Sequence, residues 1–319
     1  MTTIKKINDK NILEAVKALK RGNLVCFPTE TVYGLGADAT NNLAIAKIFN
    51  AKNRPSFNPI IVHVSSKNMV ERLGILTSLS EKIIETFCPG PLTIILERKK
   101  DSGLSDLLSA GLKTTAFRIP DNSVAIKLLK NFNKPIAAPS ANKSGYLSPT
   151  KAEHVYDQFK NNKDIPIILD DGKTKVGLES TVVYEGNNNI KILRHGGISK
   201  ELLEDSLKIK IIDDNKNTKF SKNLIAPGML KKHYSPKVPL RINATHKKND
   251  EILLGFGPDY EEPNLSKKGN LVEAAANLFS FLSIYEKKGK KIAIAPIPNN
   301  DIGRAINDRI TRASSSRNR

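Results

Sequence analysis

The sequence predicts an α/β protein in which a larger unit, built on a twisted mixed sheet, precedes a small Rossmann-like α/β unit. Short apolar runs alternate with helical patterns over most of the 319 residues, a length that can hold two domains. Several apolar runs follow each other with no helix between them, as at 165–169, 181–184 and 190–193, which favours a mixed sheet over a strictly parallel one. A polar stretch at 213–223 then separates the two units.

The larger unit is expected to begin with a helix that Asp9 caps and that ends near Arg21. The apolar run Leu24–Phe27 predicts a buried strand. The stretch 27–39 follows, and its hydroxyls and two glycines predict a turn that faces a cleft and connects this strand to a helix from Asn42. Further strands are expected at 60–64, 92–96, 114–119 and 135–139, and further helices at 78–87, from 121, from 148 and at 199–207.

We expect residues 1–208 to form the larger domain, 209–237 a connection and 238–319 the small domain. The connection carries His233 and Tyr234 in an otherwise polar stretch. We expect it to fold over the cleft of the larger domain as a lid, although a passive tether would also fit this composition. In the small domain, strands are expected at 252–256 and 291–296, and helices at 271–285 and from 301.

The composition is strongly basic, with 51 Lys and Arg against 32 Asp and Glu and a net charge of +19. Such an excess attracts polyanions such as nucleotides or RNA, but lysines spread over solvated faces would give the same charge. The two cysteines, Cys26 and Cys88, form no Cys-X-X-Cys unit, which argues against a zinc site or a disulfide framework. No run of about 18 apolar residues is present, so we expect a soluble, cytoplasmic protein without membrane contact.

Polar side chains gather at the predicted ends of the strands in the larger unit. Strand ends on one edge of an α/β sheet share one crevice, and the cations and hydroxyls here predict a pocket for a polyanion. A solvated loop would also explain Lys52 and Arg54, and a core histidine would explain His63. The set comprises Thr29, Glu30, Thr31, Tyr33, Lys52, Arg54, Asn58, His63, Thr115, Arg118, Ser140, Asn142, Ser144, Ser148, Ser180 and Arg194.

Several catalytic patterns are missing from the sequence. It contains no Gly-X-X-X-X-Gly-Lys phosphate loop, no kinase motif set and no spacing that suggests a Ser/His/Asp triad. Asp170 and Asp171 could hold a metal, but a turn after a strand explains them equally well.

Six motifs in the larger unit resemble those of the YrdC-type threonylcarbamoyl-AMP synthases. Two further motifs resemble the long form of this family, which carries a linker and an additional C-terminal domain. Small departures are Asn53 for the usual Gly, Cys88 for an aromatic residue and His195 for Pro. The motifs are Phe27-Pro28-Thr29-Glu30-Thr31-Val32-Tyr33-Gly34-Leu35, Lys52-X-Arg54-Pro55 with Asn58-Pro59 and Val62-His63, Pro89-Gly90-Pro91-Leu92-Thr93, Pro139-Ser140-Ala141-Asn142, Ser148-Pro149-Thr150, Glu179-Ser180-Thr181-Val182-Val183, Pro227-Gly228-Met229 with His233-Tyr234-X-Pro236, and Gly303-Arg304-Ala305-Ile306-Asn307-Asp308-Arg309.

The resemblance implies a nucleotidyltransferase with a YrdC-like domain whose sheet has a basic concave face. Such an enzyme condenses L-threonine, bicarbonate and ATP to threonylcarbamoyl-AMP and releases pyrophosphate. Mg²⁺ would be held mainly by the phosphates. A downstream threonylcarbamoyl transferase complex would pass the group to adenosine 37 of tRNA, and direct contact of this chain with tRNA or other double-stranded RNA is possible.

The resemblance also implies roles for individual residues. Lys52 and Arg54 are the expected catalytic residues, because positioning and charge stabilisation carry this chemistry. Glu30 receives no role. The expected nucleotide-binding residues are Lys52, Arg54, Asn58, Thr114, Ser140, Asn142, Ser148, Arg194, His233 and Tyr234, and the expected threonine-binding residues are Thr31, His63, Arg118, Ala138 and Ser180.

Two other functions remain open from the sequence. A basic concave surface could bind duplex RNA through its backbone, but aromatic residues are scarce and no RNA-binding motif is present. A carbamoyl transferase that uses carbamoyl phosphate would need acylphosphatase and zinc-finger regions, and these do not fit in 319 residues with two cysteines.

Overall fold

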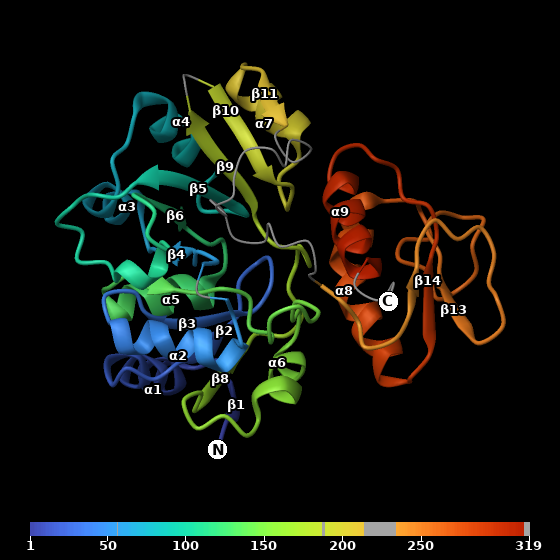
Figure 1. Cartoon of the computed structure of the whole chain (residues 1–319), viewed down its shortest axis with the longest axis horizontal. Coiled ribbons are helices and arrows are strands. Elements are labelled where there is room, and N and C mark those ends of the chain that lie inside the picture. Colours follow the sequence, from blue (N-terminus) through green and yellow to red (C-terminus); the bar gives the residue numbers. More distant parts are fainter. Residues whose placement is uncertain (56, 187–188, 214–233, 316–319) are drawn as a thin grey trace.

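The computed structural model describes residues 1–55, 57–186, 189–213 and 234–315, and these residues form two sheets in two units (Figure 1). The large sheet has 11 strands in the spatial order β1-β8-β2-β3-β7-β4-β6-β5-β9-β10-β11. The sheet contains both parallel pairs, such as β1 with β8, and antiparallel pairs, such as β5 with β6, so the predicted mixed sheet is confirmed. Its strands are β1 (Thr3–Lys6), β2 (Val25–Phe27), β3 (Gly34–Asp38), β4 (Val62–His63), β5 (Leu92–Glu97), β6 (Thr114–Arg118), β7 (Ile136–Ala137), β8 (Ile167–Asp170), β9 (Thr181–Gly186), β10 (Asn189–Arg194) and β11 (Ile211–Asp213).

Helices cover the two faces of this sheet. On one face, α1 and α5 pack against each other and bury Leu19 and Leu128 against Val25 and Phe27 of β2. On the other face lies a larger core that includes Ile45 of α2 together with residues of α4, α6 and α7. The helices of this unit are α1 (Asp9–Lys20), α2 (Asn42–Lys52), α3 (Lys67–Leu73), α4 (Ser78–Phe87), α5 (Ser123–Phe132), α6 (Ala152–Phe159) and α7 (Lys200–Leu207), with a 3₁₀ turn at Asp106–Leu108.

The predicted starts of α1 and α6 differ from the structure, whereas those of α2 and α4 agree with it. The N-cap of α1 is Asn8, whose side chain accepts a hydrogen bond from the backbone N–H of Asn11, whereas the predicted cap Asp9 is already helical. Ser148 begins no helix, because α6 starts only at Ala152. Neighbouring polar residues are interchangeable as caps, so the local sequence does not single out one of them. The prediction also missed β1, α3, β11 and β12.

The glycine stretch after β2 is a strand and not the predicted turn into a helix. Gly34–Asp38 forms β3, which pairs antiparallel with β2 and is entirely buried. A Cβ atom on Gly36 would lie 2.8 Å from the ring of Phe27 and 2.9 Å from Ile136. Gly36 therefore leaves room for the side chains of Phe27 and Ile136, which come from the two strands that flank β3 in the sheet.

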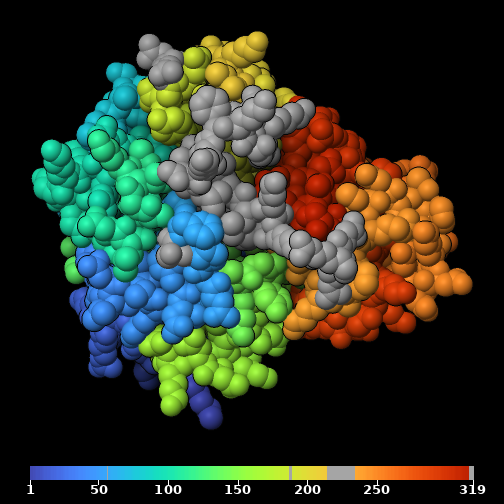
Figure 2. Space-filling model, viewed as in Figure 1, coloured from blue at the N-terminus to red at the C-terminus, as the bar shows by residue number. Residues whose placement is uncertain are grey.

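The second unit is a small parallel α/β layer, as the sequence predicts. Strand β14 (Lys291–Ile294) lies between β12 (Leu240–Arg241) and β13 (Glu251–Leu254), and all pairs are parallel. Helices α8 (Leu271–Lys287) and α9 (Gly303–Ser314) lie on the side that faces the larger unit (Figure 1). The space-filling view shows this unit, in orange to red, alongside the larger one (Figure 2).

Contacts between the units are both apolar and ionic. Leu147 and Leu178 of the larger unit belong to the same apolar core as residues of α8 and α9. Ion pairs join Lys287 to Asp157 at 2.5 Å and Arg304 to Glu201 at 2.5 Å. Within the described part of the chain, no helix has the length and apolar character needed to cross a membrane.

The predicted connection lies largely outside the described residues, which omit 214–233 and with them His233. The large sheet itself extends to Asp213, because β11 pairs with β10. The role of the connection as a lid stays a prediction.

Candidate functional site

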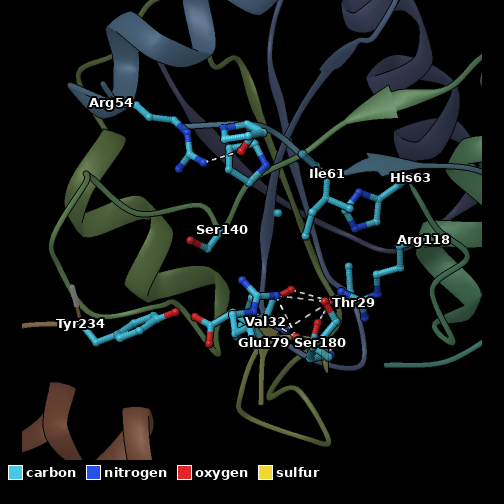
Figure 3. A pocket seen from close by; sticks show the side chains of 16 residues that line it. Thr29, Val32, Arg54, Ile61, His63, Arg118, Ser140, Glu179, Ser180 and Tyr234 are labelled. Carbon is cyan, nitrogen blue, oxygen red and sulfur yellow. Dashed lines mark hydrogen bonds between the residues drawn. The ribbon is translucent and has the colours of Figure 1, made fainter. Parts of the chain in front are cut away.

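A pocket opens on the sheet face opposite the larger core, and it has an empty volume of about 560 Å³ including its open mouth. Figure 3 shows that Arg54, His63, Arg118, Ser140, Glu179 and Tyr234 surround it from separate segments of the chain. The pocket is lined by Thr29, Thr31, Val32, Gly34, Arg54, Pro59, Ile61, His63, Arg118, Ala138, Pro139, Ser140, Glu179, Ser180, Arg194 and Tyr234.

Strand alternation places two of the polar side chains in the pocket. On β4 and β6, Val62 and Phe117 face the larger core, so their successors His63 and Arg118 point to the opposite face. The two strands are parallel neighbours, and His63 lies directly beside Arg118 in the register. Side chains that are 55 residues apart in sequence therefore meet because of the sheet order.

Arg194 reaches the pocket through a β-bulge. On β10, Ile192 faces Val183 of β9 but Arg194 faces Val182, so Leu193 is an extra residue in the ladder. Simple alternation would turn Arg194 toward the same side as Ile192, which lies in the larger core. The bulge instead turns it into the pocket, where its guanidinium donates to the backbone oxygen of Ser180 at 2.8 Å and to its hydroxyl at 3.0 Å.

The end of the pocket near Arg118 is held by a buried ion pair. A guanidinium nitrogen of Arg118 lies 2.6 Å from Oε1 of Glu30, and both side chains are 4% exposed. Glu30 thus fixes the orientation of Arg118, a role that the sequence did not assign to it. The adjacent His63 has a buried Nδ1 atom without a hydrogen-bond partner among the described residues, so this atom can bind a ligand.

His63 is neutral at physiological pH. Burial, followed by the nearby charge of Arg118, lowers the pKa of His63 from 6.5 to about 3. The unfolded chain therefore binds a proton at this residue below about pH 6.5 while the folded protein does not. Stability contributed by this difference is present above pH 6.5 and is lost progressively as the pH falls toward 3.

This shift predicts an acid-dependent loss of stability that a single substitution reduces. Between pH 7 and pH 5, the free energy of unfolding should fall by about 2 kcal/mol less in a His63→Asn variant than in the parent protein. Urea unfolding at several pH values measures the difference. Parallel curves for the two proteins would contradict a neutral, buried His63. His154, whose burial lowers its pKa to about 4, remains in both proteins.

The opposite end of the pocket contains Arg54 and Ser140. The guanidinium of Arg54 donates to the backbone oxygens of Asn58 at 3.1 Å and Pro59 at 2.7 Å, which holds it over the cavity. Lys52 does not line the pocket. Its ammonium group donates to the backbone oxygens of Ser140, at 2.6 Å, and of Asn142, so it fixes the turn that carries Ser140.

Lys52 does not lie in a solvated loop, which was the alternative interpretation that the sequence left open. It is 1% exposed, and burial followed by the charge of Arg54 lowers its pKa well below the ordinary value. Lys52 lies in the last turn of α2, four residues after Ile48 and seven after Ile45. It therefore shares the buried face of the helix with these two apolar residues.

The structure brings most, but not all, of the predicted residues to the pocket. Thr31, His63, Arg118, Ala138 and Ser180 line it, as do Arg54, Ser140, Arg194 and Tyr234. Thr114 does not, because it begins β6 and lies about 13 Å along the strand from Arg118. Asn58, Asn142 and Ser148 are buried but do not line it, and His233 lies outside the described residues.

Glu179 is a pocket residue that the sequence analysis did not select. It is 6% exposed, and its Oε1 accepts a hydrogen bond from the hydroxyl of Ser148. Its Oε2 accepts one from Nε of Arg309 at 2.8 Å. Burial opposes ionisation, but Arg309 and then Arg194 outweigh it and lower the pKa of Glu179 to about 2. In the sequence, the only indication that Glu179 belongs to the site is its place beside Ser180 in one of the family motifs.

The carboxylates near the pocket do not form a dedicated metal cage. Glu30 and Glu179 are each paired with an arginine. Among the described residues there is no group of three or more His, Cys, Asp or Glu side chains that could hold a metal ion.

Comparison with known proteins gives a consistent result over the whole chain. Residues 17–196 match a family model described as "Telomere recombination" (Sua5_yciO_yrdC), and residues 198–315 match the threonylcarbamoyl-AMP synthase C-terminal domain. A protein named threonylcarbamoyl-AMP synthase from Bacillus subtilis is 36% identical to this chain over 97% of its length. A protein of the same name from Pyrococcus abyssi is 34% identical over 98% of this chain. These matches cover 94% and 96% of the two relatives.

Solved structures agree with the sequence matches. The crystal structure of P. abyssi Sua5 complexed with L-threonine superimposes with a TM-score of 0.88 at 33% identity, and the match covers 99% of this chain and 98% of that one. E. coli YciO, at 19% identity and a TM-score of 0.55 over 61% of this chain, shares the fold. This chain therefore belongs to the threonylcarbamoyl-AMP synthase family, in the form that carries a second, C-terminal domain.

Proposed function

We propose that this protein condenses L-threonine, bicarbonate and ATP to threonylcarbamoyl-AMP and releases pyrophosphate. The observation that carries the proposal is a pocket with two cationic ends, one at Arg118 beside His63 and one at Arg54 beside Ser140. A pocket of this kind fits a small amino acid at one end and a nucleoside triphosphate at the other. Family membership and the L-threonine complex of the P. abyssi relative support the same assignment.

The amino-acid end suits L-threonine. Arg118, held in place by Glu30, has further N–H donors that can bind the substrate carboxylate through two parallel hydrogen bonds. Nδ1 of His63, which has no hydrogen-bond partner in the part of the chain that the structure describes, and the hydroxyl of Thr31 can contact the polar atoms of the substrate. A site that hydrogen-bonds a substrate hydroxyl discriminates strongly against analogues that lack it.

The nucleotide end suits the phosphates and the adenosine. Arg54 and Arg194 provide guanidinium groups, and the turn at Ser140 provides a hydroxyl that is fixed from behind by Lys52. In this arrangement Lys52 acts on catalysis by positioning the turn, and Arg54 contacts the reacting phosphates. Mg²⁺ would reach the site bound mainly by phosphate oxygens.

The chemistry requires positioning more than a protein nucleophile. The threonine amine takes up CO₂, derived from bicarbonate with loss of water, and gives a carbamate and a proton. A carbamate oxygen then attacks the α-phosphorus of ATP, and the bond to pyrophosphate breaks. Cations at the phosphates stabilise the charge that develops, and a pocket that holds both substrates aligns the attacking oxygen.

The product is a mixed anhydride that water hydrolyses, so a second protein must consume it soon after release. We propose that this consumer is a threonylcarbamoyl transferase complex that acts on tRNA. The excess of positive charge on this chain would also favour direct contact with the tRNA backbone.

Pyrophosphate release provides the test of this function. We expect release from Mg·ATP only when L-threonine and bicarbonate are both present, since neither alone forms the carbamate that attacks ATP. A coupled phosphate assay with each substrate omitted in turn measures it. Release without threonine, or no release with all substrates present, would contradict the proposal, and turnover of carbamoyl phosphate in its place would support the carbamoyl-transferase alternative.

A further inference from the structure

Arg309 on α9 extends from the small unit to residues that form the wall of the pocket. It is 0% exposed. Nε donates to Glu179 at 2.8 Å, one terminal nitrogen donates to the backbone oxygen of His195 at 2.9 Å, and the other donates to Asp308 at 2.7 Å. Its guanidinium carbon also lies 4.9 Å from the centre of the Tyr234 ring, a distance at which a cation and an aromatic ring attract each other.

Two of the groups that Arg309 contacts line the pocket, namely Glu179 and Tyr234. Tyr234 is 1% exposed and its ring also packs against Phe279 of α8, so both helices of the small unit hold it in place. Glu179 is ionised, and its two oxygens are shared between Ser148 of the larger unit and Arg309 of the small one. The small unit therefore supplies contacts that shape one side of the pocket.

The charge of Glu179 creates a difficulty for the proposed reaction. A buried carboxylate in the wall repels the phosphates of ATP, and a low local dielectric strengthens this repulsion. Arg194 also neutralises part of this charge. Arg309 is the cation that bonds directly to Glu179, and it comes from outside the larger unit.

We propose that Arg309 is a positioning residue through which the C-terminal unit completes the nucleotide end of the pocket. It neutralises Glu179, so that a polyanionic nucleotide can bind beside this carboxylate, while the ring of Tyr234 is also held by Phe279. This inference rests on the proposed function, because it takes ATP as the ligand. It assigns to the small unit a part in substrate binding through one side chain that crosses the interface.

Arg304 provides a matched control on the same helix. It also forms an ion pair across the interface, with Glu201 of α7 at 2.5 Å, but neither residue lines the pocket. Its side chain is 25% exposed and that of Glu201 is 39% exposed, so its loss leaves no buried charge. A general loosening of the interface would affect ATP binding in both arginine variants, whereas a loss of charge compensation at Glu179 would affect only the Arg309 variant.

The test compares Arg309→Met, Arg304→Met and the double variant Arg309→Met/Glu179→Gln in the full chain. Equilibrium titration with Mg·ATP gives the Kd, and steady-state kinetics give KM for ATP and for threonine. We expect Arg309→Met to raise both ATP constants about 10-fold or more, and the KM for threonine by less than about 2-fold. The double variant should recover to within about 3-fold of the parent, because the uncompensated carboxylate is gone. Arg304→Met should bind ATP like the parent.

Several results would overturn this inference. Equal ATP affinity in the Arg309→Met and double variants would exclude charge neutralisation, and an equal rise of both KM values would indicate a merely structural contact. If Arg309→Met does not fold, the double variant decides the question. A folded double variant whose Kd for ATP is more than about 10-fold above that of the parent would refute the inference. A parent protein that binds ATP but releases no pyrophosphate would refute the proposed reaction alone, since the Kd comparison still decides the role of Arg309.

Discussion

Replacing Arg118 with methionine is expected to lower kcat/KM for L-threonine about 100-fold or more, equivalent to about 2.7 kcal/mol of lost transition-state binding. The substitution removes the guanidinium that we assign to the threonine carboxylate. Arg118 is 4% exposed, so water would replace its donors poorly. Measuring pyrophosphate release as a function of threonine concentration gives the loss, and the KM for ATP should change little.

Loss of Arg118 also leaves Glu30 as a buried, unpaired carboxylate, which destabilises a protein by several kcal/mol. The double variant Arg118→Met/Glu30→Gln separates this effect from substrate binding. It should regain thermal stability but not threonine affinity, because the direct contact to the substrate is still missing. Recovery of the threonine KM in the double variant would contradict the assignment. For the pair Arg309 and Glu179, by contrast, the double variant should regain substrate affinity, in this case for ATP, because Arg309 acts through Glu179.

Replacing Arg54 with methionine is expected to lower kcat by about 10²–10³-fold. Arg54 lines the nucleotide end and is held over the cavity by two backbone oxygens, so its charge is fixed where the phosphates would lie. A preorganised cation stabilises the charge of the transition state more than that of the bound substrate, so kcat should fall more than KM rises. Single-turnover measurements with saturating ATP would test this difference.

The stability of this variant should remain close to that of the parent. Arg54 is partly exposed, and the loop oxygens that it leaves can be hydrated. Arg98→Met is a suitable control. Like Arg54, Arg98 donates to a backbone oxygen, here that of Ser105, and it pairs in addition with Asp106, but it lies outside the pocket lining. It should keep full activity. An Arg54→Met protein with parental kcat would show that the phosphates bind elsewhere.

Much of the fold could be read from local patterns. Apolar runs such as Leu92–Leu96 predict buried strands because their side chains on both faces are removed from water. The amphipathic helices α5 and α8 were recognisable for a similar reason, since one face of each carries the residues that the core buries. Motif spacing was informative about the family because each motif combines residue types that ordinary turns do not require.

Local patterns failed where backbone geometry depends on partners that are distant in sequence. Gly36 looked like a turn residue, but its lack of a side chain makes room for Phe27 and Ile136 across the sheet. Lys52 looked like a partner of Arg54 at the phosphates, but α2 directs it to the turn at Ser140. The β-bulge at Leu193 that turns Arg194 into the pocket also leaves no mark in a single sequence.

The sequence by itself determined the mixed α/β architecture, the small parallel unit and the family to which the chain belongs, because these follow from hydrophobic periodicity and from short motifs. Only the tertiary structure decided how the charges are paired, namely Arg118 with Glu30 and Arg309 with Glu179. The physical reason is that a buried charge requires a partner in space, and here the partners are separated by 88 and 130 residues of chain. Sheet order and the contact between the two units bring them together, and neither is encoded in any local stretch.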